Sequence, residues 1–275
     1  MAISPPSASR QKLISTTKGE RIYAIGDIHG RYDLLRDLLR RIEAHSKALP
    51  EPGSFHVVLL GDLVDRGPDS AEILRYLYEL DKTISGLIVL MGNHEEVMLR
   101  VYDGETLLLR PWLRIGGAET LRSFGLEPPP RDGDPVAFLE QMRRAIPREL
   151  MDWMRSLPVT ARSGDYVFVH AGVRPGVALK RQTKTDMIWI REEFLQFRGE
   201  HGATIVHGHS ISPSVDLQPN RIGIDTGAYR TGVLTALYLE GSKREIIATG
   251  EVQALDASAP AGPAHWDRSF RRSRG

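Results

Sequence analysis

The 275-residue chain has no cysteine, which excludes disulfide bonds, thiolate metal ligands and a cysteine nucleophile and fits a reducing cytoplasm. No apolar run reaches the length of a membrane-spanning helix, and residues 1–18 lack the apolar stretch of a signal peptide. Neither sign of charge prevails: 36 basic residues face 35 acidic ones, so no overall field would attract nucleic acid or an anionic membrane. We therefore expect a cytoplasmic globular protein that binds any anion through local contacts.

Strand-like and helical patterns alternate in the first hundred residues. Apolar runs typical of strands occupy 22–25, 55–60 and 86–91, and between them leucine and isoleucine recur at helical spacing. This alternation predicts a mainly parallel sheet with right-handed crossovers. From residue 166 onward, further strand-like runs with few helices between them predict a second, more antiparallel sheet.

The segment 104–157 differs from the rest, because it combines helical patterns with a run of three prolines and little strand signal. We interpret it as a small helical insert beside the sheets. The sequence thus predicts an α/β fold of two stacked mixed β-sheets flanked by helices, in a single domain over 19–255. Flexible tails are expected at 1–18 and 256–275. The arginines of the second tail could contact nucleic acid or lipid, but a solvated tail is the preferred interpretation.

Several strand-like runs end in a cluster of glycine with aspartate, histidine or asparagine. These junctions are Gly26–Gly30, Gly61–Gly67, Gly92–Glu95, His170–Gly172 and His207–His209. Open α/β sheets place their chemistry beyond the carboxyl ends of their strands, so we expect the junctions to meet at one edge. Oxygen and imidazole groups are ligands for divalent cations. One such junction would be an ordinary polar turn, whereas five in this order predict a metal centre.

The spacing within the junctions supports a centre with two cations. Side chains two residues apart in an extended segment point the same way, so Asp27 and His29 can face one ion. Asp62, Asn93, His170 and His209 occupy matching places after later strands. Two sets of imidazole and carboxylate ligands that share one carboxylate suit cations about 3.5–4 Å apart, as in two-metal hydrolases. Asp62 is the natural shared ligand.

These motifs, together with Trp189–Glu192 and Ile224–Ala228, resemble those of the metallophosphoesterase superfamily. Within it they are most similar to the calcineurin-like phosphoprotein phosphatase family of serine/threonine phosphatases, in its small bacterial and phage branch. The resemblance runs from about residue 21 to 250 and implies the calcineurin-like sandwich of two sheets. It implies that a first cation is held by Asp27, His29 and Asp62. It implies that a second is held by Asp62, Asn93, His170 and His209.

The same resemblance implies how the reaction would proceed. His94 would be the general acid and Asp65 its orienting partner, while Arg66, Arg191 and Asn93 would bind the phosphoryl oxygens. A water between the two cations would lose its proton near neutral pH and attack phosphorus directly, without a covalent phosphoenzyme. We expect Mn²⁺ at both positions, with Fe or Zn also suited to these ligands.

The expected activity is hydrolysis of phosphoserine and phosphothreonine in proteins. Two alternatives stay open, namely a symmetric bis(5'-nucleosyl)-tetraphosphate hydrolase and a broad-specificity phosphatase of small molecules. The insert at 104–157 is placed to choose between leaving groups. A catalytically silent metal-binding or scaffold domain is disfavoured, because neither a ligand nor the acid is missing. A zinc-protease helix beginning at His94 is excluded, because Met98 stands where its second histidine is required.

One position departs from the family pattern, and the roles of two others are not fixed by it. Met91 stands where family members usually carry arginine. Without the positive charge of that arginine, a phosphomonoester dianion would be bound less firmly. His207 has ligand chemistry, but Gly208–His209 matches the Gly-His pair of the family, so we interpret His207 as a packing residue or a neighbour of the ligands. The segment Gly116–Thr120 after Trp112 is predicted either to shape a substrate pocket or to form a plain turn before a helix.

Overall fold

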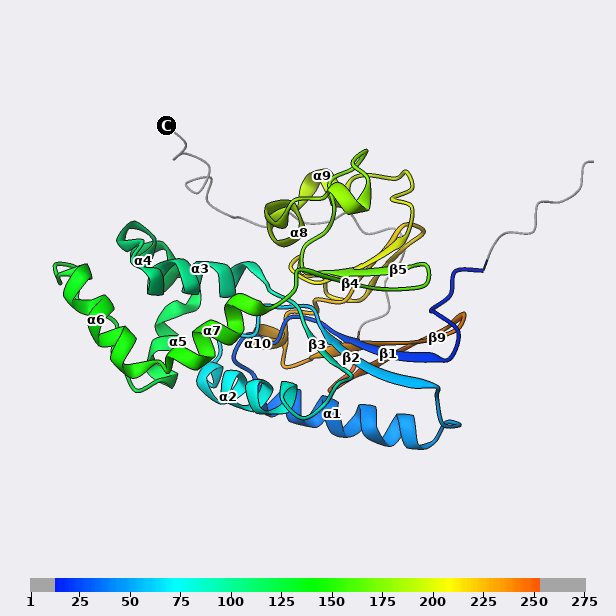
Figure 1. Ribbon diagram of the computed structural model, residues 1–275, viewed down its shortest axis with the longest axis horizontal. Coiled ribbons are helices and arrows are strands. Elements are labelled where there is room, and N and C mark those ends of the chain that lie inside the picture. Colours follow the sequence, from blue (N-terminus) through cyan, green and yellow to red (C-terminus); the bar gives the residue numbers. More distant parts are fainter. Residues whose placement is uncertain (1–12, 253–275) are drawn as a thin grey trace, which may run out of the picture.

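The computed structural model describes residues 13–252, which form two stacked five-stranded β-sheets with helices on their outer faces (Figure 1). The predicted fold of two mixed sheets flanked by helices is confirmed. The predicted tail at 256–275 lies outside the described residues, as do residues 1–12 of the predicted N-terminal tail. Over residues 13–252 we find no helix with the length and apolarity required to span a bilayer.

The first sheet has the strand order β10-β9-β1-β2-β3. Its strands are β1 (Glu20–Ile25), β2 (Ser54–Leu59), β3 (Leu87–Val89), β9 (Thr235–Glu240) and β10 (Lys243–Ala248). β1, β2 and β3 are parallel, as predicted, whereas β9 is antiparallel to both β1 and β10. The last two strands therefore belong to the first sheet, because β9 returns alongside β1 and a tight turn leads from it into β10.

The second sheet has the strand order β4-β5-β6-β8-β7. Its strands are β4 (Thr160–Ser163), β5 (Tyr166–Val169), β6 (Thr204–His207), β7 (Asp216–Gln218) and β8 (Arg221–Gly223). The central strands β5, β6 and β8 are parallel and the two edge strands antiparallel, which corrects the expectation of a more antiparallel sheet. β4 and β7 were not predicted, because they are short and mostly unburied and so lack an apolar run.

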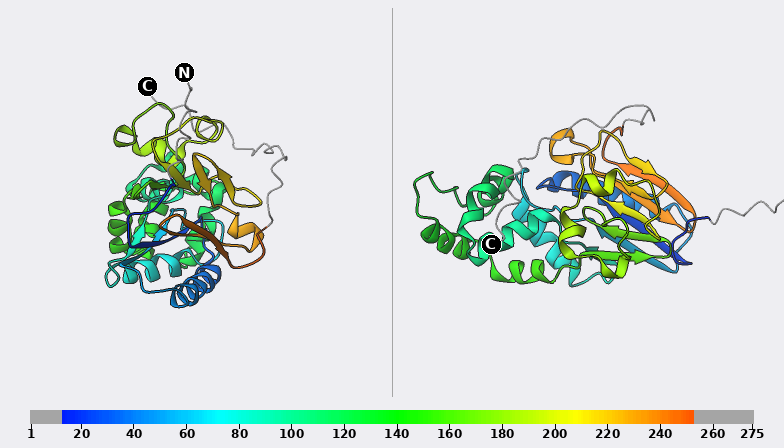
Figure 2. Two further views of the ribbon diagram at one scale, coloured as in Figure 1. Left: turned by 90° about the vertical axis from the view of Figure 1, so that its right-hand side faces the viewer. Right: turned by 90° about the horizontal axis from the view of Figure 1, so that it is seen from above.

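The helices and the two sheets form four layers. The longer helices are α1 (Tyr32–Lys47), α2 (Ser70–Asp81), α3 (Asn93–Asp103), α4 (Thr106–Trp112), α6 (Pro135–Ala145) and α7 (Arg148–Ser156). The shorter ones are η1 (Leu113–Gly117), α5 (Ala118–Ser123), η2 (Leu179–Arg181), α8 (Lys184–Trp189), α9 (Glu192–Leu195) and α10 (Ala228–Thr231). α1 and α2 cover the first sheet, and α8 and α9 lie over the second (Figures 1 and 2).

Three apolar clusters separate these layers. The helical spacing of leucines places Leu35 and Leu38 of α1 in the same buried cluster as Tyr23 of β1. A second cluster lies between the two sheets, and a third packs α8 and α9 onto the outer face of the second sheet. Both sheets are thus buried on two faces, which explains why their central strands read as continuous apolar runs.

The predicted insert is helical and forms a lobe beside the sheets, in green in Figure 1.

Near the N-terminus, residues expected in a flexible tail instead contact both sheets. The backbone N–H of Thr16 donates to the carbonyl of Gly241, and that of Ser15 donates to the carboxylate of Asp165. The packed chain therefore begins before residue 18, because these backbone groups find partners on the sheets.

Candidate metal centre

The residues predicted to bind metal all follow strand ends. Asp27 and His29 follow β1, Asp62 follows β2, Asn93 opens α3 after β3, His170 follows β5 and His209 follows β6. Strands β1, β2 and β3 are parallel to one another, and so are β5 and β6, so their carboxyl ends lie at common edges. The fold therefore brings together side chains that are up to 182 residues apart.

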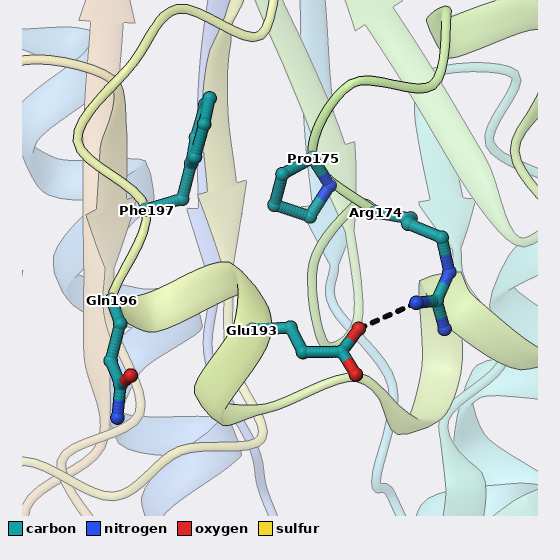
Figure 3. Close-up of a pocket in the computed structure, with 5 residues that line it drawn as sticks. All are labelled: Arg174, Pro175, Glu193, Gln196 and Phe197. Carbon is teal, nitrogen blue, oxygen red and sulfur yellow. Dashed lines mark hydrogen bonds and ion pairs between the residues drawn. The ribbon is translucent and has the colours of Figure 1, made fainter.

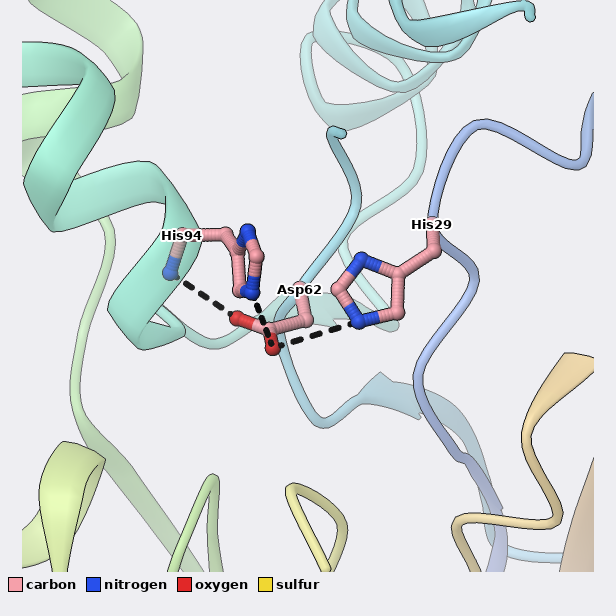
Figure 4. Close-up of side chains that lie close together, drawn as sticks. All are labelled: His29, Asp62 and His94. Carbon is pink, nitrogen blue, oxygen red and sulfur yellow. Dashed lines mark hydrogen bonds and ion pairs between the residues drawn. The ribbon is translucent and has the colours of Figure 1, made fainter. Parts of the chain in front are cut away.

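Asp62 lies at the centre of this cluster. Its Oδ2 is 3.5 Å from Nε2 of His29 and 3.9 Å from Nε2 of His94 (Figure 4). Its Oδ1 is 3.4 Å from Nε2 of His170. Donor atoms of His29, Asp62 and His94 lie within 4.8 Å of one another, and so do those of Asp62, His170 and His209. The two donor groups share one carboxylate, as two divalent cations require, but the first contains His94 where the sequence predicted Asp27.

Backbone carbonyls fix the orientation of two imidazoles. Nδ1 of His29 lies 2.8 Å from the carbonyl oxygen of Val64, and Nδ1 of His170 lies 2.9 Å from that of Leu60. A ring that donates its Nδ1 proton to a carbonyl leaves Nε2 as a lone pair facing the cluster, which is the form that binds a metal. Nε2 of His170 also lies 2.8 Å from Oδ1 of Asn93.

Burial keeps three of these imidazoles neutral. Desolvation lowers the pKa of His29, of His170 and of His209 below the usual value for histidine. A neutral ring can bind a cation without first losing a proton. The donor set is therefore ready to hold divalent cations at neutral pH.

His94 differs from these three imidazoles in the direction in which its pKa is shifted. Its Nδ1 donates to Oδ2 of Asp65 at 2.6 Å. Burial alone would lower the pKa of His94, but the carboxylates of Asp62 and Asp65 outweigh it and raise that pKa. The raised pKa favours the protonated ring, and its Nε2 faces the cluster. Both features fit the predicted role of a general acid.

Strained backbone is concentrated at the cluster. Among residues 13–252, the non-glycine residues with left-handed torsions are His29 (φ 46°), Asp62 (50°), Asp65 (72°), Arg66 (71°) and His209 (62°). All five are predicted site residues. Left-handed torsions cost on the order of 1–2 kcal/mol for a residue with a side chain. Such strain persists where the surrounding structure holds it, and here it aims side chains at one point.

Two arginines reach the cluster from the loop after β2 and from the turn between α8 and α9. The terminal nitrogens of Arg66 lie 2.7 Å from Nε2 of His29 and 3.0 Å from Nε2 of His94. A terminal nitrogen of Arg191 lies 3.1 Å from both Nε2 and the carbonyl oxygen of His209. Guanidinium groups at these places could pair with phosphoryl oxygens, as predicted for both residues.

Asp225 joins the cluster, although the sequence analysis assigned it no role. It follows β8, and its carboxyl group lies close enough to that of Asp27 to raise the pKa of Asp27. Burial raises the pKa of Asp225 to about 6, and burial together with the Asp225 carboxyl raises that of Asp27. Two buried carboxyl groups in contact cannot both ionise without a cation nearby, so the pair fits a cation site. An aspartate directly after a strand was the available signal.

Glu95 is a second residue to which the sequence analysis gave no role. Its Oε2 accepts the backbone N–H groups of Asp62 and Gly92 at 2.8 and 2.9 Å. Its Oε1 accepts those of Leu63 and Val64 at 2.8 and 3.2 Å. The carboxylate therefore ties the loop after β2 to the start of α3. Glu95 is the third residue of α3, where an acidic side chain is typical of a capping box; the sequence had predicted the helix to begin at Glu95 itself.

Three positions that the sequence singled out lie apart from the donor groups. His207 is buried at the end of β6, where burial lowers its pKa to about 4 and its ring packs edge-on against Phe194. Met91 is buried in the apolar cluster of the first sheet and the helical lobe. Trp189 donates its indole N–H to the carboxylate of Glu96 at 2.6 Å. His207 is thus a packing residue, and Met91 lies where a charge would lack a polar environment.

A surface hollow of about 470 Å³ lies beside α9 (Figure 3). It is lined by Arg174, Pro175, Glu193, Gln196 and Phe197, which include no predicted site residue. Arg174 and Glu193 form an ion pair of 2.5 Å in its wall. Their charges offset each other and leave little attraction for a phosphate, so we assign no site to this hollow.

We expect the affinity of the protein for Mn²⁺ to rise as the pH increases from about 5 to about 7.5. The pKa of Asp225 is raised to about 6 and that of Asp27 is raised as well. At the acidic end of this pH range a proton therefore competes with the cation for these two carboxylates. Isothermal titration calorimetry at several pH values measures the affinity. Asp225→Asn should flatten the dependence, and an affinity independent of pH in the unmodified protein would contradict the assignment.

Comparison with known proteins agrees with this geometry. Residues 20–234 match the family of calcineurin-like phosphoesterases. The symmetrical bis(5'-nucleosyl)-tetraphosphatase of Nitrosospira multiformis is 34% identical over 160 residues, which are 58% of this chain and 46% of that protein. Its counterpart in Aromatoleum aromaticum is 35% identical over 157 residues, which are 56% and 45% of the two proteins. The chain thus spans about half the length of the curated relatives it matches.

Solved structures share the fold at lower sequence identity. A candidate diadenosine tetraphosphatase has a TM-score of 0.59 at 23% identity, and the match covers 86% of this chain and 96% of the other. A protein serine/threonine phosphatase from Saccharomyces cerevisiae has a TM-score of 0.52 at 15% identity, covering 88% and 86%. At these identities the likeness concerns the fold alone. Because the family match extends over most of the chain, the protein belongs to the calcineurin-like phosphoesterase family.

Proposed function

We propose that the protein is a metal-dependent phosphoesterase that hydrolyses symmetrical dinucleoside tetraphosphates into two nucleoside diphosphates. The observation that carries the proposal is the pair of donor groups sharing Asp62, in a chain whose curated relatives are symmetrical bis(5'-nucleosyl)-tetraphosphatases. These relatives favour dinucleoside tetraphosphates as substrates over the phosphoproteins expected from the sequence motifs. The likeness to a protein serine/threonine phosphatase supports only the shared fold.

The residues that would hold the two cations are those predicted from the sequence: His29, Asp62, His170 and His209 of the donor groups, Asn93 beside His170, and Asp27, which accepts the N–H of His209 and lies near Asp225. Bound cations would lower the pKa of the attacking water and offset the charge of the phosphoryl oxygens. Mn²⁺ is our choice, and Fe or Zn would suit the same ligands.

The side chains of the protein would orient the substrate and move one proton. The oxygen of water adds to one of the two central phosphorus atoms and gives up one proton to solvent, and the bond breaks between that phosphorus and the oxygen that bridges the two central phosphorus atoms. His94 donates its proton to the bridging oxygen, which leaves as part of a nucleoside diphosphate. Arg66 and Arg191 bind the non-bridging oxygens, where negative charge is spread in the transition state.

A substrate panel tests this proposal. With Mn²⁺ present, we expect kcat/KM for diadenosine tetraphosphate to exceed that for a phosphoserine peptide by about 100-fold, because about 3 kcal/mol of transition-state binding corresponds to that factor. Chromatography of the nucleotide products should show ADP alone. The release of AMP and ATP, or faster cleavage of the peptide, would overturn the substrate assignment. Equal turnover of all phosphoesters would instead favour the broad-specificity phosphatase.

His94→Asn tests general acid catalysis independently of which phosphoester is the preferred substrate. The variant should lower kcat for every substrate of the panel, because general acid catalysis contributes typically 10²–10⁴-fold. His56→Asn is the matched control, since His56 lies in β2 and belongs to neither donor group. Unchanged turnover in the His94 variant would contradict the assignment of the acid even if diadenosine tetraphosphate were the preferred substrate.

A further inference from the structure

The helical insert contacts the partner of the candidate acid directly. The indole N–H of Trp112 is shared between the two carboxylate oxygens of Asp65, at 3.1 Å from Oδ1 and 3.0 Å from Oδ2. The hydroxyl of Thr120 donates to Oδ1 of Asp65 at 2.6 Å. Nδ1 of His94 donates to Oδ2 of Asp65 at 2.6 Å. Three side-chain donors from three segments thus fix one buried carboxylate in a single orientation.

The insert also holds the strained backbone on which Asp65 lies. Asp65 and Arg66 are consecutive residues with left-handed torsions, an arrangement that costs on the order of 1–2 kcal/mol for each. The N–H of Asp65 donates to the hydroxyls of Thr120 and Ser70, at 2.9 and 3.1 Å. The N–H of Arg66 donates to the carbonyl of Gly116 at 3.1 Å. Two of these three acceptors belong to the insert, so the insert supports this loop conformation.

A glycine pair lets the insert approach so closely. Gly116 has a φ of 121°, and a Cβ there would lie 2.4 Å from the backbone nitrogen of Arg66. A Cβ on Gly117 would lie 2.4 Å from ring carbons of Trp112. These glycines lie in the π-helical turn η1, which joins the helix that carries Trp112 to the helix that carries Thr120. The turn therefore presents both side chains to the same carboxylate.

From these contacts we infer that Trp112 and Thr120 are positioning residues that hold Asp65, and through it His94, in the orientation required for proton donation. The inference rests on the proposed function, in which His94 is the general acid. The segment Gly116–Thr120 forms the turn before a helix that the sequence offered as one alternative, and it also contacts the Asp65 loop. The insert would thus act on protonation of the leaving group.

Leaving groups of different basicity test this inference. Thr120→Val removes the hydroxyl at constant shape, and Trp112→Phe keeps an aromatic ring without its N–H. On phenyl phosphate, whose leaving oxygen needs a proton, we expect each variant to lower kcat by about 10–100-fold, the usual effect of removing a supporting contact. On p-nitrophenyl phosphate, whose leaving group departs as a stable anion, kcat should fall less than about threefold. KM should stay unchanged for both esters.

Two further variants distinguish positioning from general support of the fold. Thr120→Ser retains the hydroxyl and should restore kcat on phenyl phosphate. Ser123→Ala removes a hydroxyl of the insert that accepts the N–H of Ala71 in α2 and donates to the backbone carbonyl of Thr120, without touching Asp65. It should lower the melting temperature and leave the ratio of the two kcat values unchanged. Equal losses on both esters in the Thr120 and Trp112 variants would overturn the inference.

A spectroscopic measurement tests the same contacts without activity. The short hydrogen bond from Nδ1 of His94 to Asp65 should give a far-downfield proton resonance in the NMR spectrum of the unmodified protein. The resonance should be retained in Thr120→Ser and lost or shifted in Thr120→Val and Trp112→Phe. If it is unchanged in those two variants, Trp112 and Thr120 do not position the dyad, whichever phosphoester the protein hydrolyses. If the resonance moves as expected but diadenosine tetraphosphate is not cleaved, the substrate assignment fails and the positioning role stands.

Discussion

Asp62→Asn is expected to lower kcat/KM for phosphoester hydrolysis by at least about 10³-fold. Asp62 is the carboxylate common to both donor groups, so its loss affects the binding of two cations at once. Metal ions supply several kcal/mol of charge stabilisation in the transition state, and each 1.36 kcal/mol corresponds to a factor of ten in rate. Asparagine has the same shape but carries no charge and offers one oxygen in place of two.

The measurement combines kinetics with cation binding. Calorimetric titration with Mn²⁺ should show two bound ions in the unmodified protein and weaker binding at both positions in Asp62→Asn. Asp132→Asn is the matched control, because Asp132 is exposed in the helical lobe and belongs to neither donor group. Full activity in Asp62→Asn, or loss of one ion with the other bound normally, would show that Asp62 is not shared.

The strand-end residues could be predicted because their signal is local. Each motif combines an apolar run with a glycine-flanked polar cluster, and the topology of parallel strands then places the clusters at common edges. The glycines confirm how tightly the loops pack. A Cβ on Gly67 would lie 2.2 Å from the carbonyl oxygen of His29, and one on Gly30 would lie 2.5 Å from that of Gly67. Backbones that pass so closely require glycine at both places.

The supporting contacts could not be predicted because they join distant segments. Trp112 contacts Asp65 across 47 positions of sequence, and Asp225 contacts Asp27 across the two sheets. No periodicity or spacing encodes such pairs. The edge strands β4 and β7 were missed for another reason, since they have few buried residues and so no pattern of alternation. The sequence thus predicted a ligand set at the strand ends, and the structure added the contacts that hold these side chains in place.

Glu95 makes contacts that its place near the start of a helix does not predict. Its side chain is fully buried, and each carboxylate oxygen accepts two backbone N–H groups. Four N–H groups of the loop after β2 and the start of α3 have this one side chain as an acceptor. Since the N–H of Asp62 is among them, Glu95 couples the stability of the fold to the position of Asp62, the carboxylate common to both donor groups.

Glu95→Gln is therefore expected to destabilise the protein by about 2–5 kcal/mol, although the two side chains have nearly the same shape. An amide offers one acceptor oxygen, so two of the four buried N–H groups would face an NH₂ group, and each unsatisfied group costs about 1–3 kcal/mol. Urea unfolding measures the loss, and Mn²⁺ affinity should fall about 10–100-fold as Asp62 loses its support. Glu51→Gln, at an exposed loop position, should change neither quantity. A Glu95 variant as stable as that control would mean that the loop after β2 is held by its other contacts and that glutamate is not required there.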